Sequence, residues 1–275
     1  MKYSIITINY NNCDGLRKTI ESVISQSYKD YEFIVIDGGS TDGSREIIEQ
    51  HSDSINYWVS ESDKGIYNAM NKGIRQAKGE YLNFMNSGDT FYKSETLATV
   101  NEQIDDSDFY IGKDYNVNPE TGEHFITILP SRISMAMFFV WTLPHQSSFI
   151  KRSLFTDSFY DENLRITSDW KFYLEKIVYE GCSFKILDIV ICNREQDGIS
   201  NVQLGKMAEE RNSILTRILP PGIYKDYKSL SHLDRSTLYK LLNLLDQEKG
   251  CKYITFAVKI IHRLLNKYPR LFQSE

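Results

Sequence analysis

Residues 3–43 read YSIITINYNNCDGLRKTIESVISQSYKDYEFIVIDGGSTDG and contain the alternation that decides the fold. Residues 3–9 are β-branched and apolar, which predicts a buried strand. Residues 16–25 place their apolar side chains on one helical face. Residues 31–36 are a second apolar run that ends in a polar, glycine-containing segment. The stretch therefore predicts a strand–helix–strand unit with both strands buried.

The alternation of strand and helix continues clearly to residue 89. A short helix around residues 47–48 precedes a third strand at residues 57–59, and a helix at residues 67–77 precedes a fourth strand at residues 81–85. This order predicts a parallel, doubly wound sheet with right-handed crossovers. In such sheets ligands bind beyond the carboxyl ends of the strands. The polar segments expected at that edge are residues 9–11, 37–40, 61–64 and 86–89.

Beyond residue 89 the pattern loosens, and beyond residue 200 it becomes helical. We expect strands at residues 109–112, 125–129 and 183–191, a polar break at 196–200, a Pro220-Pro221 stop, and helices at 94–104, 167–179, 204–219, 230–245 and 253–265. A boundary near residue 203 would divide the chain into an α/β domain, residues 1–203, and an α-helical C-terminal extension, residues 204–275.

The composition is that of an ordinary soluble protein with a real core. Of the 275 residues, 41% are hydrophobic and 25% are charged, which excludes disordered and low-complexity classes. The net charge of −5 argues against nucleic acid as a partner. Four scattered cysteines without a C-x-x-C pair fit a reducing compartment. Because we find neither a signal peptide nor an apolar stretch of about 20 residues, we expect a cytoplasmic protein.

Each polar strand end also has an ordinary structural interpretation when it is taken alone. Asp89, after Gly88, could hold Mg²⁺ or Mn²⁺ beside a diphosphate, or it could belong to a simple turn. The segment that begins with Asp37 is either a ligand loop or a turn before a helix cap. Asp169, in the first turn of a predicted helix, is either a functional acid or an acid stabilised by the helix dipole.

Four motifs, taken together and in order, are more specific. Residues 4–11 (SIITINYN), 35–43 (VIDGGSTDG), 62–73 (SDKGIYNAMNKG) and 86–89 (NSGD) resemble the family 2 glycosyltransferases in order and spacing. The resemblance extends over about residues 1–200. It implies a GT-A fold and an inverting enzyme that uses a nucleotide sugar, with a nucleotide-binding half at about residues 1–92 and an acceptor half at about 93–203.

The resemblance also implies which residues bind the nucleotide. Thr7, Asn9 and Asn11 would line the pocket, with Tyr10 near the base. The family usually has two acids after the second strand, the second of which contacts uracil, and this chain has Gly38 at that second position. The complete expected nucleotide set is Thr7, Asn9, Tyr10, Asn11, Asp37, Gly38, Asp63, Lys64, Ser87 and Gly88.

The resemblance implies two further roles for acids. Asp89 matches the last acid of the family's metal motif and would be a single protein ligand to Mg²⁺ or Mn²⁺. Asp169 matches the general base, which would take the proton of the attacking acceptor hydroxyl; Ser168 stands where the family more often has Glu. His145 is either a structural histidine or an acceptor or metal contact, and Trp170 either stacks on a sugar or belongs to the core.

We therefore predict an inverting hexosyl- or N-acetylhexosaminyl-transferase. It would move sugar from a nucleotide-diphosphate sugar, UDP-sugar favoured, to a hydroxyl of a glycan or lipid-linked acceptor in surface polysaccharide biosynthesis. The alternatives are a catalytically degenerate nucleotide-binding protein, a dinucleotide-dependent oxidoreductase and an interaction module built on the helical tail. The missing Gly-x-Gly-x-x-Gly after the first strand argues against the oxidoreductase.

The C-terminal residues 249–270 contain six Lys or Arg and no acid, interleaved with apolar side chains. Such a basic amphipathic helix can lie on an anionic membrane surface. It can equally pack its apolar side on the catalytic domain or on a second subunit of a homo-oligomer. The expected location is therefore cytoplasmic, with peripheral contact to the inner face of the membrane as one of the open alternatives.

Overall fold

The structure is a computed structural model that describes residues 1–118, 121–130, 132–195 and 203–229, together with residues 237, 240 and 244. The chain divides into two compact units. Residues 1–129 and 142–224 form the first unit, and residues 130–141 and 225–275 form the second.

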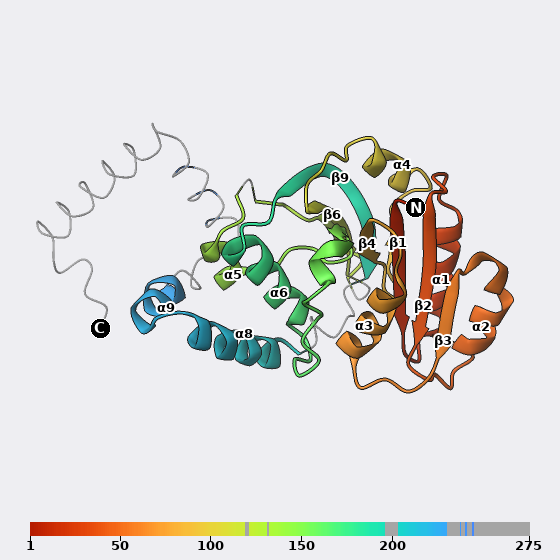
Figure 1. Cartoon of the computed structure of the whole chain (residues 1–275), viewed down its shortest axis with the longest axis horizontal. Coiled ribbons are helices and arrows are strands. Elements are labelled where there is room, and N and C mark those ends of the chain that lie inside the picture. Colours follow the sequence, from red (N-terminus) through yellow and green to blue (C-terminus); the bar gives the residue numbers. More distant parts are fainter. Residues whose placement is uncertain are drawn as a thin grey trace, which may run out of the picture. The chain divides into compact units, whose positions relative to one another are not determined.

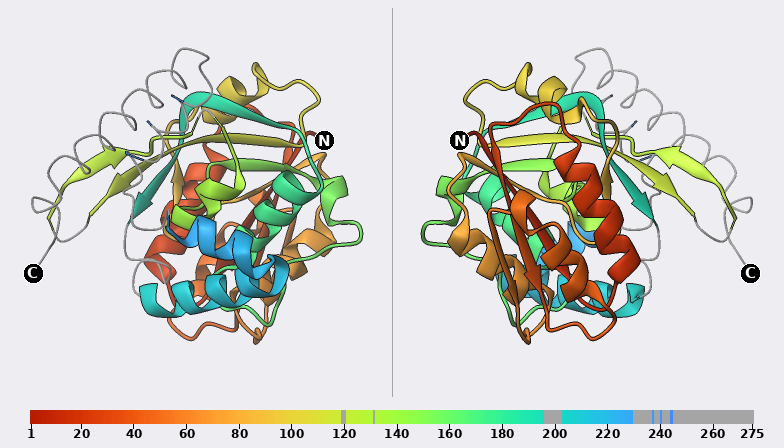
Figure 2. Two further views of the ribbon diagram at one scale, coloured as in Figure 1. Left: turned by 90° about the vertical axis from the view of Figure 1, so that its left-hand side faces the viewer. Right: turned by 90° about the vertical axis from the view of Figure 1, so that its right-hand side faces the viewer.

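The first half of the first unit is a parallel sheet wound on both faces. Its strands lie in the order β3-β2-β1-β4, and every neighbouring pair is parallel. Helices α1 and α2 lie side by side on one face, while α3 packs on β1 and β2 (Figures 1 and 2). The elements are β1 (Tyr3–Asn9), α1 (Cys13–Ile24), β2 (Tyr31–Asp37), α2 (Ser44–Gln50), β3 (Tyr57–Ser60), α3 (Ile66–Gln76) and β4 (Tyr81–Phe84). The predicted doubly wound arrangement is confirmed.

The second half extends the same sheet with mixed directions. β8 lies antiparallel between β4 and β6, and β6 is parallel to β9. β5 pairs with β9 and β7 with β6, both antiparallel. The elements are β5 (Thr90–Phe91), α4 (Thr96–Asn101), β6 (Phe109–Val117), β7 (His124–Ile126), β8 (Ser148–Lys151) and β9 (Phe184–Glu195). The sheet is thus mostly parallel at one end and mixed at the other.

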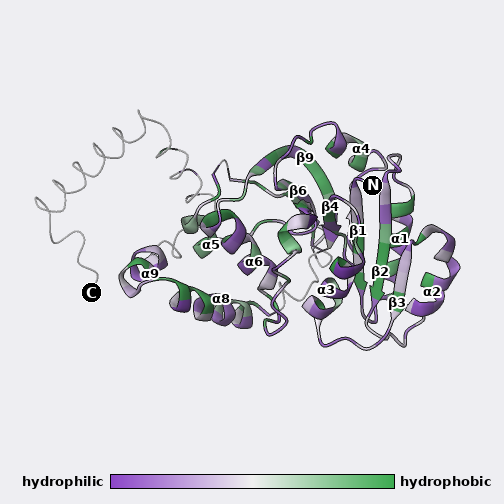
Figure 3. Cartoon of the chain, viewed as in Figure 1, coloured by the Kyte–Doolittle hydropathy of each residue, from purple (hydrophilic) through white to green (hydrophobic). Residues whose placement is uncertain are grey.

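Helical segments cover the rest of the first unit. α6 (Ser168–Tyr173) continues without a break into a π-helical segment (Leu174–Tyr179), as the sequence pattern at 167–179 predicts. α8 (Leu204–Ile218) carries both hydrophilic and hydrophobic residues (Figure 3), and its Ile214 and Leu215 are buried. α9 (Pro221–Lys228) begins directly at the proline pair, because the fixed φ of proline suits the first turn of a helix.

The second unit contains a helix that periodicity did not reveal. α5 (Met135–Val140) is apolar at every position, so its sequence shows no helical face. Within this unit the rings of Phe139 and Tyr227 stack at a centroid distance of 5.5 Å. The expected polar break at 196–200, the helix at 253–265 and the basic segment at 249–270 lie outside the described residues, as does most of the expected helix at 230–245.

The core of the first unit lies on both faces of the parallel strands. Ile5 and Phe33 belong to one cluster with Leu16 and Ile20 of α1, and all four are fully buried. Burying large apolar side chains of this kind stabilises a fold by about 1.5–3 kcal/mol each. The domain boundary near residue 203 stays a prediction, and α8 groups with the first unit.

Candidate active site

The carboxylate of Asp37 joins the ends of three strands. It accepts hydrogen bonds from Asn9 Nδ2 (2.7 Å), Ser40 Oγ (2.5 Å), Ser40 N (3.0 Å) and Ser60 Oγ (2.6 Å). Burial acts to raise the pKa of Asp37, but the hydrogen bonds from Ser40, Ser60 and Asn9 outweigh it, so the pKa is lowered. The side chain of Asp37 is fully buried, and its hydrogen bonds hold the ends of the neighbouring strands in place.

The loop after β2 is fixed to the loop after β1. Asn11 has a φ of 49° and accepts a hydrogen bond from Thr41 N at 2.9 Å. Asp42 accepts one from Cys13 N at 2.8 Å, which satisfies a free donor at the N-terminus of α1. These contacts bring together the segments 9–11 and 37–43, as the strand-end argument predicts.

Gly38 lies against Tyr10 and Asp63. A Cβ at position 38 would lie 3.0 Å from Asp63 Oδ2 and 3.1 Å from Tyr10 Cδ2. Tyr10 is 70% exposed, so its ring is available for a ligand. Asp63 is held by Lys72, whose Nζ is 2.5 Å from Asp63 Oδ1 and 2.8 Å from Glu61 Oε1. Sequence reasoning did not single out Lys72, although it lies within the quoted motif at 62–73.

The turn that carries Asp89 is organised by the hydroxyl of Thr19. Gly88 N donates to Thr19 Oγ1 at 3.0 Å, and the Oγ1 lies 2.7 Å from the carbonyl oxygen of Asp89. Gly88 has a φ of 101°, a conformation that favours glycine. Ser87 accepts a hydrogen bond from Asn12 Nδ2 through its carbonyl oxygen at 3.3 Å. Asp89 is 8% exposed at this edge of the sheet.

Thr7, the other residue expected near the nucleotide, is buried. Its hydroxyl donates to the carbonyl oxygen of Met85 at 2.7 Å and so joins the end of β1 to the segment after β4. Lys64 is exposed, and its backbone N–H donates to Asn68 Oδ1 at 3.2 Å. Some of the residues expected to bind the nucleotide, such as Thr7, are therefore buried and hold strand ends together, whereas others, such as Lys64, are exposed.

Asp169 lies in the first turn of α6 and is oriented by a tyrosine from another helix. Tyr67 Oη, on α3, donates to Asp169 Oδ1 at 2.7 Å. Burial, and then the charge of Asp169, raise the pKa of Tyr67 well above its usual value, so the phenol stays protonated. Asp169 is partly exposed. Sequence reasoning did not assign Tyr67 to the candidate site, because its contact with Asp169 spans 102 positions.

His145 and Trp170 face the interior. His145 Nε2 lies 2.8 Å from Tyr160 Oη, and the imidazole stacks on Phe84 at a centroid distance of 4.8 Å. Burial lowers the pKa of His145, which favours the neutral ring. Trp170 is 1% exposed, and the guanidinium of Arg211 lies 5.2 Å from the centroid of its ring. These contacts agree with the structural alternative for both residues.

Helix α8 supports the segment that leads into α6. The carboxylate of Glu210 accepts hydrogen bonds from Arg165 N (2.9 Å), Ile166 N (3.0 Å) and Thr167 Oγ1 (3.0 Å). Asp169 follows two residues later, so Glu210 helps to fix the position of the candidate base. No motif in the sequence pointed to Glu210, because the contact depends on how α8 packs.

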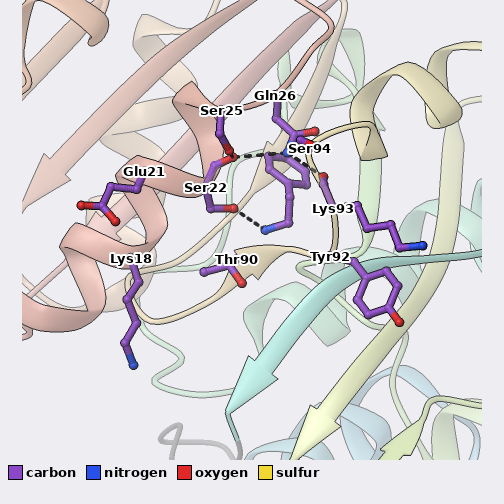
Figure 4. A pocket seen from close by; sticks show the side chains of 10 residues that line it. Lys18, Glu21, Ser22, Ser25, Gln26, Thr90, Tyr92, Lys93 and Ser94 are labelled. Carbon is purple, nitrogen blue, oxygen red and sulfur yellow. Dashed lines mark hydrogen bonds between the residues drawn. The ribbon is translucent and has the colours of Figure 1, made fainter.

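A hollow of about 510 Å³ opens beside the Asp89 turn, between α1 and β5 (Figure 4). None of the expected site residues lines it. Its walls are held together by hydrogen bonds from Phe91 N to Ser22 Oγ (2.7 Å) and from Gln26 Nε2 to Lys93 O (2.8 Å). The lining residues are Lys18, Glu21, Ser22, Ser25, Gln26, Thr90, Phe91, Tyr92, Lys93 and Ser94.

Comparison with known proteins shows to which protein family the chain belongs. The family model described as "Glycosyl transferase family 2" matches residues 4–176, more than half of the chain. The chain belongs to glycosyl transferase family 2. An uncharacterized glycosyltransferase of Mycobacterium tuberculosis is 31% identical over 72% of this chain and 76% of its own length. A PGL/p-HBAD biosynthesis glycosyltransferase of Mycobacterium bovis is 26% identical over 78% of this chain and 86% of its own length.

Solved structures show that the family 2 chain has the expected GT-A type fold. S. aureus TarS in complex with UDP-GlcNAc superimposes with a TM-score of 0.64 at 19% identity, over 84% of this chain and 71% of that chain. In a longer TarS structure, the match spans 45% of that chain. A mannosyltransferase from Pyrobaculum calidifontis, in complex with GDP-Man and Mn²⁺, matches with a TM-score of 0.60 at 17% identity, over 94% of this chain and 80% of that chain.

Proposed function

We propose that this family 2 glycosyltransferase moves a hexosyl or N-acetylhexosaminyl group from a UDP-sugar to a hydroxyl of a glycan or lipid-linked acceptor, with inversion. The observation that carries the proposal is the partly exposed carboxylate of Asp169, oriented by Tyr67 at 2.7 Å. A single positioned carboxylate is what a transferase needs as general base, whereas a glycosidase uses two flanking carboxyl groups.

We infer different tasks for the two oxygens of Asp169. Oδ1 accepts the hydrogen bond of Tyr67, which fixes the plane of the carboxylate. Oδ2 then accepts the proton of the acceptor hydroxyl as that oxygen attacks the anomeric carbon. The attack comes from the side opposite the departing nucleoside diphosphate, so the configuration at the anomeric carbon inverts.

The residues at the Asp89 turn fit a divalent cation held chiefly by its substrate. Among the described residues, no three His, Cys, Asp or Glu side chains gather into a metal-binding group. Mg²⁺ is commonly bound through one or two protein carboxylates together with substrate phosphates and water, and Asp89 supplies one carboxylate at the expected edge. When bound, the metal would neutralise charge on the diphosphate.

The donor class and the biological setting rest on the relatives. The TarS complex contains UDP-GlcNAc, and a PGL/p-HBAD biosynthesis glycosyltransferase is among the similar proteins. We propose surface polysaccharide or glycolipid assembly in the cytoplasm or at the inner face of the membrane. Within the described ranges, no helix combines the length and the apolar character that crossing a membrane requires.

Calorimetric titration tests the donor site. UDP, GDP, dTDP and CMP are added to the purified protein with and without Mn²⁺. We expect micromolar binding of UDP that depends on the metal, followed by transfer from a UDP-sugar in a donor screen. Binding of UDP without transfer or hydrolysis of any UDP-sugar would favour the catalytically degenerate alternative. Binding of none of the four nucleotides would contradict the proposed function.

A further inference from the structure

Arg211 of α8 lies beside the candidate base and has no assigned role. Its guanidinium lies over the ring of Trp170, 5.2 Å from the centroid, and Trp170 is the next residue after Asp169. The titratable groups that act on Arg211 electrostatically are Asp169 and Tyr67. A cation from α8 therefore stands next to the pair that would activate the acceptor hydroxyl.

One hydrogen-bond donor of this cation, Nε, has no partner among the described residues. Arg211 Nε is buried away from solvent, and no group in the described part of the chain accepts its hydrogen bond. Burial lowers the pKa of Arg211 to about 10, so the side chain is still a cation at neutral pH. A buried donor on a charged group without a partner is unfavourable, because solvation is lost and nothing replaces it.

Asp169 does not accept the hydrogen bond that Arg211 Nε could donate. Its Oδ1 is hydrogen-bonded to Tyr67, and the unpartnered Nε shows that Asp169 does not accept from that atom. The contact with Trp170 orients the guanidinium but satisfies none of its N–H groups. The exposed Arg45, by contrast, pairs with Glu49 at 2.9 Å.

We propose that Arg211 binds an anionic oxygen group of the acceptor, a phosphate or a carboxylate, next to the hydroxyl that Asp169 deprotonates. A guanidinium presents N–H donors in a fixed plane that match such a group, often through two parallel hydrogen bonds. This inference rests on the proposed function, because it takes Asp169 as the base. It adds a substrate class: acceptors that carry negative charge close to the reacting hydroxyl.

The position of Arg211 favours the acceptor over the donor. The groups expected to contact the donor come from the strand-end segments 9–11, 37–38, 63–64 and 87–89. Arg211 comes instead from α8, the helix that also holds the segment before α6 through Glu210. Both residues thus belong to the side of the site that carries Asp169.

Anion binding provides a test that does not require the true acceptor. Inorganic phosphate and acetate are titrated separately into the full-length protein with saturating UDP and Mg²⁺, so that the diphosphate site is occupied. Tryptophan fluorescence reports binding, because Trp170 lies under the guanidinium. We expect Arg211→Gln to weaken binding of the preferred anion about tenfold or more, which corresponds to loss of a charged hydrogen bond.

Two further variants control for charge and for folding. Arg217→Gln removes the same charge from an exposed position of α8 and should bind the anion as the original protein does. Arg211→Lys retains the cation without the planar donor group, so binding should be intermediate. If phosphate binds more tightly than acetate, the acceptor carries a phosphate ester; the reverse order indicates a carboxylate.

Three results would overturn the proposal. The first is that the original protein binds neither anion. The second is that Arg211→Gln binds the anion as tightly as the original protein does. The third is a tenfold loss of UDP affinity in Arg211→Gln, which would assign Arg211 to the donor site. Failure of the proposed function gives a different result, namely no UDP binding by the original protein. Anion titrations without UDP would then still measure whether Arg211 contributes to anion binding.

Discussion

The hydroxyl of Tyr67 lies 2.7 Å from Oδ1 of Asp169 and donates a hydrogen bond to it, joining two residues that are 102 positions apart. Tyr67 is 5% exposed, so this donor does not depend on solvent. The ring of Tyr160 lies 5.6 Å from that of Tyr67 and packs against it. Asp169 is therefore held by a packed, protonated tyrosine, which leaves its second oxygen available for chemistry.

Replacing Tyr67 with Phe should lower kcat about tenfold with little change in the KM for the nucleotide sugar. The ring and its packing are retained, while one hydrogen bond of about 1–1.5 kcal/mol to the carboxylate is lost. Steady-state kinetics on a UDP-sugar measures the effect. Tyr57→Phe removes a hydroxyl from an exposed ring of β3 and serves as the control. An unchanged kcat would show that Tyr67 does not position the base.

Replacing Asp169 with Asn should abolish transfer while nucleotide binding is retained. Loss of a general base lowers rates by about 10²–10⁴-fold, and the amide keeps the shape of the side chain. Transfer assays and UDP calorimetry on the same sample separate the two effects. Asp157→Asn, at an exposed position, is the matched control. Substantial residual transfer by Asp169→Asn would remove Asp169 from the role of base.

Asp89→Ala should weaken the metal-dependent part of nucleotide-sugar binding and leave the metal-independent part unchanged. The reason is that Asp89 would supply the protein carboxylate to the cation. Calorimetric titrations with Mn²⁺ and with EDTA measure the two parts. Asp53→Ala removes an equal charge from an exposed position of the short 3₁₀ helix Ser52–Ser54 and should behave like the original protein. The same metal dependence in Asp89→Ala would contradict the assignment.

The stability of the protein should depend on pH through Asp37. Its folded-state pKa is lowered, with the hydrogen bonds from Ser40, Ser60 and Asn9 outweighing burial. Such a group contributes stability that is fully present above the unfolded-state pKa of about 3.9 and is lost as the pH falls through the lower folded-state pKa. Asp37→Asn should therefore reduce the free energy of unfolding at pH 7 by about 1.5–3 kcal/mol.

Urea denaturation at several pH values measures this dependence. The difference between Asp37→Asn and the original protein should begin to shrink as the pH falls below about 4, where the unfolded chain takes up the proton. It should be lost once the pH has passed through the lower folded-state pKa, where the carboxylate of the folded protein is protonated as well. Asp14→Asn, in the first turn of α1 at an exposed position, provides a comparison. A difference that is independent of pH would show that the charge of Asp37 does not stabilise the strand ends.

The sequence by itself determined the parallel half of the sheet and the family. Residues 3–9 and 31–36 are short, largely apolar and β-branched runs that predict buried strands, and each is followed by polar residues. Local patterns of this kind are set by neighbours in the chain, so they can be read without a structure. The same holds for the helix at 167–179, whose start places Asp169 in a first turn.

Only the tertiary structure decided which of these polar residues serve structure and which remain available. Asp37 and Thr7 follow the same strand-end rule as the exposed residues Tyr10 and Asn11, yet both are fully buried. The contacts of Tyr67 with Asp169 and of Glu210 with the segment before α6 join distant parts of the chain. Hydrogen bonding and burial depend on which elements pack together, and sequence spacing does not encode that packing across 45 or 102 positions.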